Sequence, residues 1–493
     1  MDNSEQYHEW CDALQAPDKD KMELLIGLNF NVNIQTRNGF GEHNQTALQI
    51  AITQTADFLT DRAIWISIVD MLLTANADPM LGYGCTAIQT CLNCGCVETL
   101  PLLMEKCAYD INSGVHRFPN GGTLVMKAVE RSDEIALCML IEYGVDLFCV
   151  DQRNEGVLHV ATDKNITEII LNHLKYEPNL KAFINLQNTD GNTPIHLACR
   201  RSNFRMCHEL LKVNADVTSL NLLHETPLHE LVKNGNSHNA NHDTAQLTCL
   251  NMLLQRSVPV NKRNKEGDSC LHLAVRNGFS LLTTPLLSAG ANVIQKDARG
   301  RTSFHLGVLG VTSAYELEAL QTLLDHKTFR RHYLDIKDDD GFTPLLLAAQ
   351  IRRISVINSL CEKGADVNSQ DNEGNTAIIL STRANSYSIV EKSIRHGASI
   401  YTSNQAGETP WKIVTATDKV EVISTEWDDI GDDAKQYERH RKTHSVLIKW
   451  MSRIKEKAVH ILMGSHERLG IQSILRGIPP DVLVNIACLS SVE

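Results

Sequence analysis

Short apolar segments with helical spacing alternate with polar turns through the middle of this chain, and the alternation has a fixed length. A phrase of the form Thr-Pro-Leu-His opens many of the segments, as at Thr193, Thr226 and Thr343. Other copies begin at Ser269 and Thr302, and weaker ones at Thr46, Thr86, Thr123, Gly156, Thr376 and Thr409. Because five of the intervals between copies are 33 residues long, we infer one structural unit repeated many times.

Each copy predicts the same local structure. A threonine at a helix N-cap accepts a backbone N–H, and a proline at the first helical position lacks a donor that would be unpaired there anyway. Ile195, Leu228 and Ala198 then face a core at helical spacing. A glycine about 20 residues after the phrase, such as Gly290 or Gly364, ends a second helix in a left-handed cap. A turn of the D/N-x-x-G kind then projects between one unit and the next.

The longer intervals, of 37 to 43 residues, are interpreted as 33-residue units with loop insertions of 4 to 10 residues. Phrase, turn and a closing signal such as "EKGADVNS" recur in register. On these residues the chain resembles the ankyrin-repeat family over roughly 36–418, with about 11 units. The resemblance implies an all-α solenoid of stacked helix-turn-helix units with β-hairpin tips, in which each unit covers the apolar face of its neighbour.

The two ends depart from the repeat. Residues 1–35 are predicted to form a degenerate N-terminal capping repeat that lacks the phrase, and the ankyrin-repeat array is predicted over 36–418. The acid-rich stretch 419–433 is expected to be an exposed linker. Residues 434–493 are expected to form a small C-terminal helical segment, beginning with an amphipathic helix over roughly 434–463.

The tail has two interpretations that stay open. Its helices either cap the last repeat or recruit a partner. The stretch "IPPDVLVNIACL" resembles the opening helix of an F-box, found truncated after ankyrin arrays in poxviral proteins, and more loosely a SOCS box. That resemblance implies a substrate receptor of a cullin-type ubiquitin ligase, which would bind its adaptor through Pro480, Val482, Leu483 and Ile486.

Composition narrows the setting of the protein. A hydrophobic content of 43% is typical of a folded chain, and the polar amino terminus does not look like an export signal. No run of about 18 apolar residues occurs, so no membrane insertion is expected. We therefore expect a cytoplasmic, or nuclear, protein with reduced thiols. The net charge of −12 argues against nucleic acid as a partner.

The stretch "TCLNCGCVE" suggests a metal or redox site but aligns with the repeat. Cys91 falls at the small buried position of Ala198, and Gly95 falls in the turn with Cys94 and Cys96 beside it. No second C-x-x-C accompanies it, so the alignment predicts packing residues rather than a zinc site or a redox dithiol. The recurring histidines, such as His196, are expected to hydrogen-bond between repeats. We expect no metal and no cofactor.

No nucleotide-binding loop, serine elbow, H-E-x-x-H or kinase motif occurs, so no catalytic residue is assigned. Ankyrin repeats usually bind a partner protein on the concave surface. Carried over by position, the resemblance implies tip contacts from Arg153, Asn154, Asp190, Lys265, Arg299, Asp338 and Asp339. Exposed first-helix positions should include Arg200, Arg201, Arg276, Asn277, Arg352 and Arg353. The arginines suit an acidic segment, or are ordinary solvated charge. The predicted function is a non-enzymatic protein-interaction scaffold or adaptor.

Overall fold

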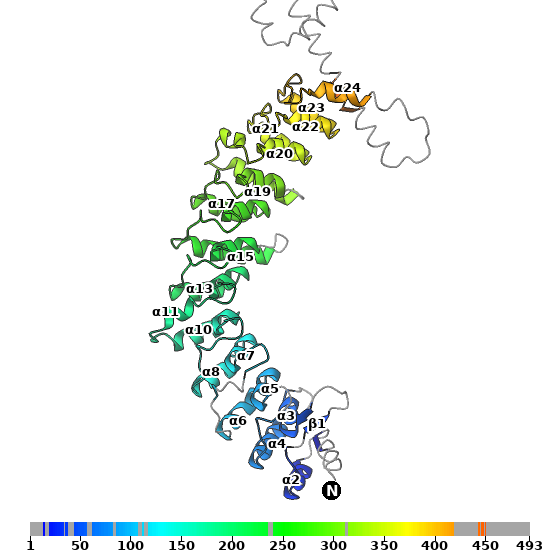
Figure 1. The fold of residues 1–493 in the computed structure, drawn as a ribbon. Helices are drawn as coiled ribbons and strands as arrows, with labels where there is room; N and C mark the ends of the chain where they lie inside the picture. Colours follow the sequence, from blue (N-terminus) through cyan, green and yellow to red (C-terminus); the bar gives the residue numbers. More distant parts are fainter. Residues whose placement is uncertain are drawn as a thin grey trace, which may run out of the picture. The chain divides into compact units, whose positions relative to one another are not determined.

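The computed structural model describes residues 13–14, 19–33, 35–37, 44–56, 62–81, 85–106, 111–112, 117–234, 240–310, 314–418, 442–443, 445–447 and 449. The chain forms two compact units, Met1–Val258 and Pro259–Glu493. The predicted array extends over parts of both. In each unit, helical pairs stack one on the next in chain order (Figure 1).

The first unit begins with α2 (Lys19–Gly27) and a short antiparallel hairpin of β1 (Gln35–Arg37) and β2 (Asn44–Thr46), in which Thr36 pairs with Gln45. The helices that follow are α3 (Ala47–Gln54), α4 (Arg62–Thr74), α5 (Ala87–Cys94), η1 (Val97–Thr99), α6 (Leu100–Lys106), α7 (Leu124–Glu130), α8 (Glu134–Glu142), α9 (Val157–Val160), α10 (Lys164–His173), α11 (Leu180–Ile184), α12 (Pro194–Arg200), α13 (Phe204–Lys212), α14 (Pro227–Lys233) and α15 (Ala240–Leu254).

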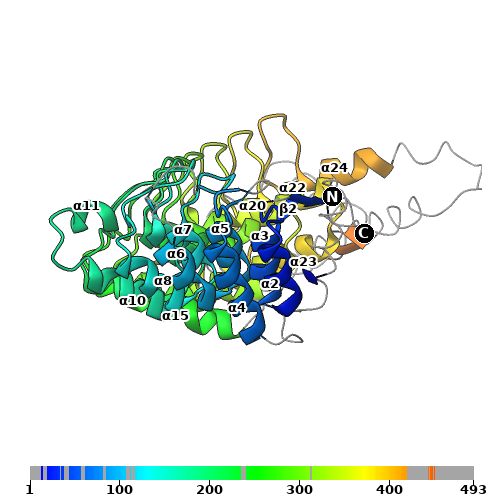
Figure 2. The ribbon, with the colours of Figure 1, turned by 90° about the horizontal axis from the view of Figure 1, so that it is seen from below.

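The second unit repeats the same plan. Its helices are α16 (Cys270–Arg276), α17 (Ser280–Ser288), α18 (Ser303–Gly310), α19 (Ala314–Asp325), η3 (Arg331–Asp335), α20 (Pro344–Gln350), α21 (Ile354–Glu362), α22 (Ala377–Arg383), α23 (Tyr387–Arg395) and α24 (Pro410–Asp418). The view in Figure 2 shows that the loops joining successive pairs project beyond one edge of the helical layers. Apart from the β1–β2 hairpin, the described elements of each unit are helices, with the turns gathered on one side.

The repeated phrase forms the predicted helix starts. Thr46, Thr86 and Thr343 are extended N-cap residues whose side chains accept the backbone N–H of the third helical residue. First helices pack on first helices, as α12 on α14 and α20 on α22, and second helices do likewise, as α17 on α19. Ile195 and Leu228 are fully buried between them. Stacking therefore supplies the core, as predicted.

The longer intervals are not absorbed as the sequence predicted. In the 40-, 43- and 41-residue steps the second helix is longer: α4, α15 and α19 have 13, 15 and 12 residues, against 9 in α8 or α21. Among the described residues, α11 and η3 also lie in connections between repeats. The prediction of simple loop insertions was wrong for these three steps, because added residues at a helix end gain backbone hydrogen bonds that an irregular loop does not supply.

Buried histidines connect successive repeats. The third residue of α9, α12, α16 and α18 is a histidine whose Nδ1 accepts the backbone N–H of its own N-cap residue, at 3.0 to 3.3 Å. Nε2 must then carry the proton and donate it to a backbone carbonyl beyond the helical pair. These bonds run from His159 to Asn192, His196 to Glu225, His272 to Gln295 and His305 to Phe342, at 2.9 to 3.1 Å. The predicted role of the histidines is confirmed.

Two glutamines make the same connection where the phrase is weaker. Gln49 Oε1 accepts the Thr46 N–H at 3.1 Å, and its Nε2 donates to the carbonyl of Cys85 at 2.7 Å. Gln89 Nε2 donates to the carbonyl of Arg117 at 3.0 Å. An amide offers one acceptor and one donor at its end, as the neutral imidazole does. The bridge between repeats therefore needs a side chain with one hydrogen-bond donor and one acceptor, and either histidine or glutamine supplies both.

A second set of hydrogen bonds, from a backbone N–H to an Asn or Asp side chain, joins adjacent repeats where the connection after the second helix begins. Asn112 Oδ1 accepts the backbone N–H of Asp146 at 2.7 Å, and Asn368 Oδ1 accepts that of Ser399 at 2.7 Å. The same bond runs from Asp216 to Asn185, from Asn292 to Asn261 and from Asp366 to Asp335, at 2.7 to 2.9 Å. Each bond joins equivalent positions of adjacent repeats, so a slip between them would leave these groups unpaired.

At the C-terminal end the structure describes only a few residues of the predicted helical segment. Residues 442–443, 445–447 and 449 are helical, Leu447 is buried, and the Lys442 ammonium lies 5.6 Å from the ring centroid of Tyr387 on α23. These contacts place this helix against the last repeats. The predicted linker, 419–433, and the residues Pro480, Val482, Leu483 and Ile486 lie outside the described residues.

Candidate partner-binding surface

The projecting turns are held in one conformation by their own side chains. Asn188 Oδ1 accepts the backbone N–H groups of Asp190 and Asn192, and Asp338 does the same for Asp340 and Phe342. Adjacent turns also join through backbone bonds: the Thr189 N–H donates to the carbonyl of Arg153 at 2.8 Å, and five further pairs of turns among the described residues make the same bond. Side chains at the tips are thus displayed from a fixed backbone, as a recognition surface requires.

The first unit places its predicted tip residues side by side. Arg153 and Asp190 are exposed and lie 3.6 Å apart, so each partly neutralises the other. Asn154 adopts a positive φ of 57°, and its side-chain amide donates to the carbonyl of Gln187 at 2.6 Å. Arg153 and Asp190 remain accessible to a partner, whereas Asn154 has a structural role in the turn.

The predicted arginines of the first unit already have acceptors. Arg200 donates two bonds to the carboxylate of Glu230, at 2.8 and 2.9 Å, and Glu230 also accepts from Asn221 at 3.1 Å. Although burial alone would raise the pKa of Glu230, the Arg200 guanidinium lowers it. Arg201 donates to the carbonyls of His159 and Ala161, at 3.1 and 3.3 Å. Both guanidinium groups therefore join one repeat to another.

The second unit shows the same engagement. Arg276 pairs with the buried carboxylate of Asp268 at 2.8 Å, and Arg352 donates to the carbonyl of Ala384. Arg353 is the N-cap residue of α21. The predicted exposure is wrong for Arg276, Asn277 and Arg353, which are half-buried because the next repeat covers that end of the first helix. Lys265, Arg299 and Asp339 are exposed at the tips, and Asp338 is half-buried beneath them.

An open concavity lies in the second unit, where two turns meet two first helices. An open hollow of about 400 Å³ is lined by Asp340, Phe342, Gln350, Asp371, Asn372, Glu373, Asn375, Leu380 and Arg383. Asp371 is buried and holds the turn by accepting the backbone N–H groups of Glu373 and Asn375. The floor of the hollow is therefore held by hydrogen bonds, while Asp340 and Glu373 are exposed at the rim of the hollow.

Negative charge dominates this hollow. Arg383 is engaged by Glu408. Among the described residues neither Asp340 nor Glu373 forms an ion pair with a lysine or arginine. Burial, together with the neighbouring carboxylates of Asp340 and Asp339, raises the pKa of Asp338. The hollow thus combines a fixed polar floor with uncompensated carboxylates, and it is suited to a cationic group.

Sequence reasoning named the turns but missed the hollow. It placed Asp338 and Asp339 at a tip, yet Asp340 and Glu373 carry the charge, and Gln350, Leu380 and Arg383 come from the helices α20 and α22. The available signal was the run "KDDDG" followed one repeat later by "DNEG". Two acidic turns in successive units must lie next to each other once the units stack, which would have identified the surface.

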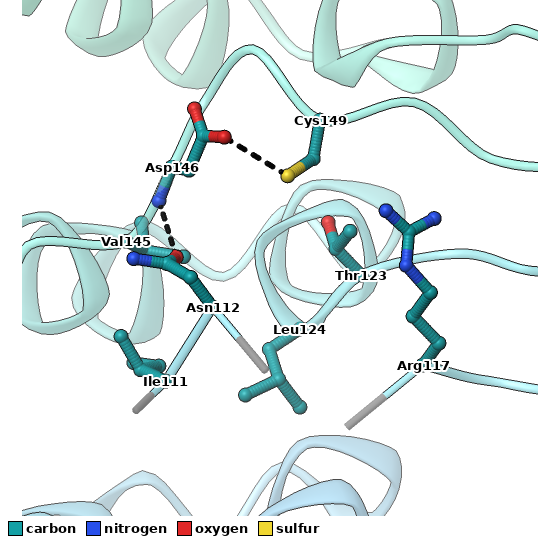
Figure 3. Close-up of a pocket in the computed structure, with 8 residues that line it drawn as sticks. All are labelled: Ile111, Asn112, Arg117, Thr123, Leu124, Val145, Asp146 and Cys149. Atoms are coloured by element: carbon teal, nitrogen blue, oxygen red, sulfur yellow. Dashed lines mark hydrogen bonds between the residues drawn. The ribbon is translucent and has the colours of Figure 1, made fainter. Parts of the chain in front are cut away.

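A second, small pocket lies in the first unit around Asn112 (Figure 3). It has a volume of about 10 Å³, and is lined by Ile111, Asn112, Arg117, Thr123, Leu124, Val145, Asp146 and Cys149. Cys149 Sγ lies 3.1 Å from Asp146 Oδ2, and Asn112 bonds to the Asp146 backbone. A space of this size holds about one water molecule, so it does not serve a ligand.

Other kinds of site were sought over the described ranges of the chain. There, no group of three His, Cys, Asp or Glu side chains is arranged to hold a metal ion. The helices of the same residues include none with the length and apolar character of a membrane span. Cys91 is buried at 1% exposure, and Gly95 adopts the left-handed conformation at the end of α5, as the alignment with the repeat predicted.

Comparisons with known proteins agree with this architecture. The family description "Ankyrin repeats (3 copies)" matches residues 158–241 and 309–404. The ankyrin repeat protein nuc-2 of Neurospora crassa is 30% identical over 244 residues, which cover 47% of this chain and 20% of that protein. The nuclear factor NF-kappa-B p105 subunit of Gallus gallus is 31% identical over 162 residues, 32% of this chain and 16% of that protein.

A probable serine/threonine-protein kinase of Dictyostelium discoideum is 33% identical over 164 residues, covering 32% of this chain and 18% of the kinase. The chain thus spans a fifth or less of the length of these relatives. The family match covers repeats whose phrase, caps and bridging histidines are present in the structure. From the recurring units and the matching family description, the chain is an ankyrin-repeat protein.

Proposed function

We propose that this chain is a non-enzymatic adaptor of the cytoplasm or nucleus that binds partner proteins across its turns and first helices. Ankyrin repeats are a protein-interaction fold, which supports the general function. The observation that carries the proposal is the hollow of the second unit, bounded by the turns at Asp340 and Glu373 and by α20 and α22. It is concave, rigid at its floor and charged at its rim, as binding surfaces commonly are.

The charge of the hollow favours a positively charged partner segment. Asp340 and Glu373 offer carboxylates to a lysine or arginine, and such pairs increase association rates and help to select the partner. An acidic segment, which the arginines suggested, has less support. It would have to compete with Glu230 for Arg200 and with Asp268 for Arg276, and leaving a buried carboxylate without its cation costs free energy.

Neutralising the hollow tests this proposal. We expect the double substitution Asp340→Asn and Glu373→Gln to reduce proximity labelling of a subset of cellular proteins by about threefold to tenfold, because each exposed pair contributes up to about 1 kcal/mol. The matched control is Glu362→Gln with Glu391→Gln, which removes the same charge from the second helices α21 and α23. An identical labelling pattern for the two variants would argue against the hollow as the binding surface.

The ligase interpretation of the tail rests on sequence and stays a prediction. If the tail recruits a ubiquitin-ligase adaptor, the full chain should retain a Skp-type or Elongin-type protein in a pull-down. Substitution of Pro480 and Leu483 together should abolish that retention, while leaving partners of the hollow bound. If neither adaptor binds the unsubstituted chain, the helices that follow residue 434 are better explained as a cap on the repeats.

A further inference from the structure

The turn after α5 brings two thiols together. Gly95 adopts a φ of 77°, and both Gly95 and Cys96 donate their backbone N–H to the carbonyl of Cys91, at 2.9 and 3.0 Å. This tight turn folds the chain back, so that the Cys94 and Cys96 sulfurs both approach α3 of the preceding repeat. Both sulfurs therefore meet the same turn of α3 from positions two residues apart in the chain.

The two thiols have different surroundings. Cys94 is half-buried, and its sulfur lies 4.0 Å from the Thr53 hydroxyl of the preceding repeat. Cys96 is buried at 1% exposure, and its sulfur lies 3.0 Å from the carbonyl oxygen of Ile52. Cys94 is therefore the thiol that a small reagent reaches from solvent, and Cys96 is the buried thiol that can react with Cys94 afterwards.

A fixed cation lies beside the turn. Arg131 Nη1 donates to the carbonyl of Asn93 at 2.7 Å, and its guanidinium lies directly against Gly95, where a Cβ would meet Nη2 at 2.5 Å. The neighbouring Cys96 thiol, the Thr53 hydroxyl and the charge of Arg131 lower the pKa of Cys94 to about 6, against the opposing effect of burial. By contrast, burial raises the pKa of Cys91 to about 12.

We propose that Cys94 and Cys96, which the alignment with the repeat assigned to packing rather than to redox chemistry, form a hydroperoxide-reactive dithiol. The Cys94 thiolate attacks one oxygen of hydrogen peroxide, so the O–O bond breaks, a sulfenic acid forms on Cys94 and hydroxide leaves. The Cys96 sulfur then attacks the Cys94 sulfur, the S–O bond breaks, and the hydroxyl leaves as water with the Cys96 proton. The thiols lose two electrons, and the hydroxide takes up the proton that Cys94 released when it ionised, so one peroxide is reduced to two waters.

Oxidation of the two thiols would change their contacts with the neighbouring repeat. Cys96 Sγ bonds to Ile52 and Cys94 Sγ lies near Thr53, and both partners belong to α3 of the preceding unit. Because a disulfide leaves no thiol hydrogen to donate, the Ile52 carbonyl loses its bond. The packing of α3 against α5 is thereby linked to the redox state of the turn.

Peroxide treatment of the reduced full chain at pH 7, followed by alkylation and peptide mass spectrometry, tests the proposal. We expect a Cys94–Cys96 disulfide, two hydrogens lighter, before oxidation of the exposed Cys138. A thiol with a pKa of about 6 is about 90% thiolate at pH 7, but its lower nucleophilicity leaves about a three- to sixfold advantage over an ordinary thiol. The same cysteine in the urea-unfolded chain supplies that reference rate.

Variants separate the steps. Cys96→Ser should stop the reaction at a Cys94 sulfenic acid, captured with dimedone, whereas Cys94→Ser should abolish it. Cys91→Ala, which introduces the residue found at the equivalent Ala198, is the matched control and should leave disulfide formation unchanged. Reaction of Cys94 no faster than in the unfolded chain, or preferential oxidation of Cys138, would overturn the proposal. So would a Cys96→Ser variant that yields no trapped sulfenic acid.

Discussion

Replacing His272 and His305 together with glutamine is expected to remove most of the acid sensitivity of the second unit while leaving its stability at pH 7 nearly unchanged. Both imidazoles are buried and neutral, with Nδ1 accepting and Nε2 donating. Gln49 and Gln89 make the same two bonds in this chain, so the substitution follows a solution the fold already uses.

The sign of the effect follows from the pKa values. Burial lowers the pKa of His272 and His305 to about 4, from an unfolded value of about 6.5. Between these values the unfolded chain binds more protons, so stability is full above about pH 6.5 and falls as the pH drops to about 4. The shift corresponds to about 3 kcal/mol lost per histidine.

Urea unfolding at pH 7 and pH 4.5, followed by hydrogen exchange in α16 and α18, measures this difference. The original chain should lose most of the stability of these helices at the lower pH, and the double glutamine variant should lose much less. His396→Gln, at an exposed position of the same unit, is the control and should behave as the original chain does. Equal acid sensitivity in all three proteins would show that the buried histidines do not control it.

The substitution Gly267→Ala is expected to destabilise the second unit by about 3 kcal/mol, whereas Gly290→Ala should cost about 1 kcal/mol. Both glycines have a positive φ, 80° and 87°, so both substitutions carry the same backbone strain. The two positions differ in the space available to an added Cβ. A Cβ at Gly267 would meet the backbone nitrogen of Ala298 at 2.5 Å, while a Cβ at Gly290 meets nothing within 4 Å.

The clash matters because it lies between two repeats. Ala298 donates its N–H to the carbonyl of Glu266 at 3.3 Å, so pushing the turns apart also breaks the bond that joins them. Hydrogen exchange should increase in both α16 and α18 for Gly267→Ala, and only close to Ala289 for Gly290→Ala. Similar exchange in the two variants would mean that the turns do not need close contact to hold the stack.

The elements of each unit could be predicted because the chemistry that forms them is local. The Thr193-Pro194 pair starts the helix α12 through its own N-cap geometry, and Ile195 and Ala198 show which side of that helix is buried. The inter-repeat histidine bonds were also predictable, since a buried imidazole that recurs at one position needs partners at that position. Position in the repeat thus conveyed most of the fold.

What escaped prediction depends on neighbours. Arg200 is exposed, as predicted, but its ion pair escaped prediction because the acceptor, Glu230, stands 30 positions later and reaches it only after the repeats stack. Gln49 was read as part of a weak copy, although its amide replaces the imidazole in function. The hollow combines side chains of two turns and two helices, and its depth depends on tertiary packing that residue spacing does not define.

Hydrogen exchange of the full chain with His196→Ala tests most directly whether each repeat is held in place by its neighbour. His196 lies in α12, but its Nε2 donates to Glu225, which precedes α14. Our account predicts faster exchange in both α12 and α14, and recovery of both with His196→Gln. Faster exchange confined to α12, with α14 unchanged, would contradict the account.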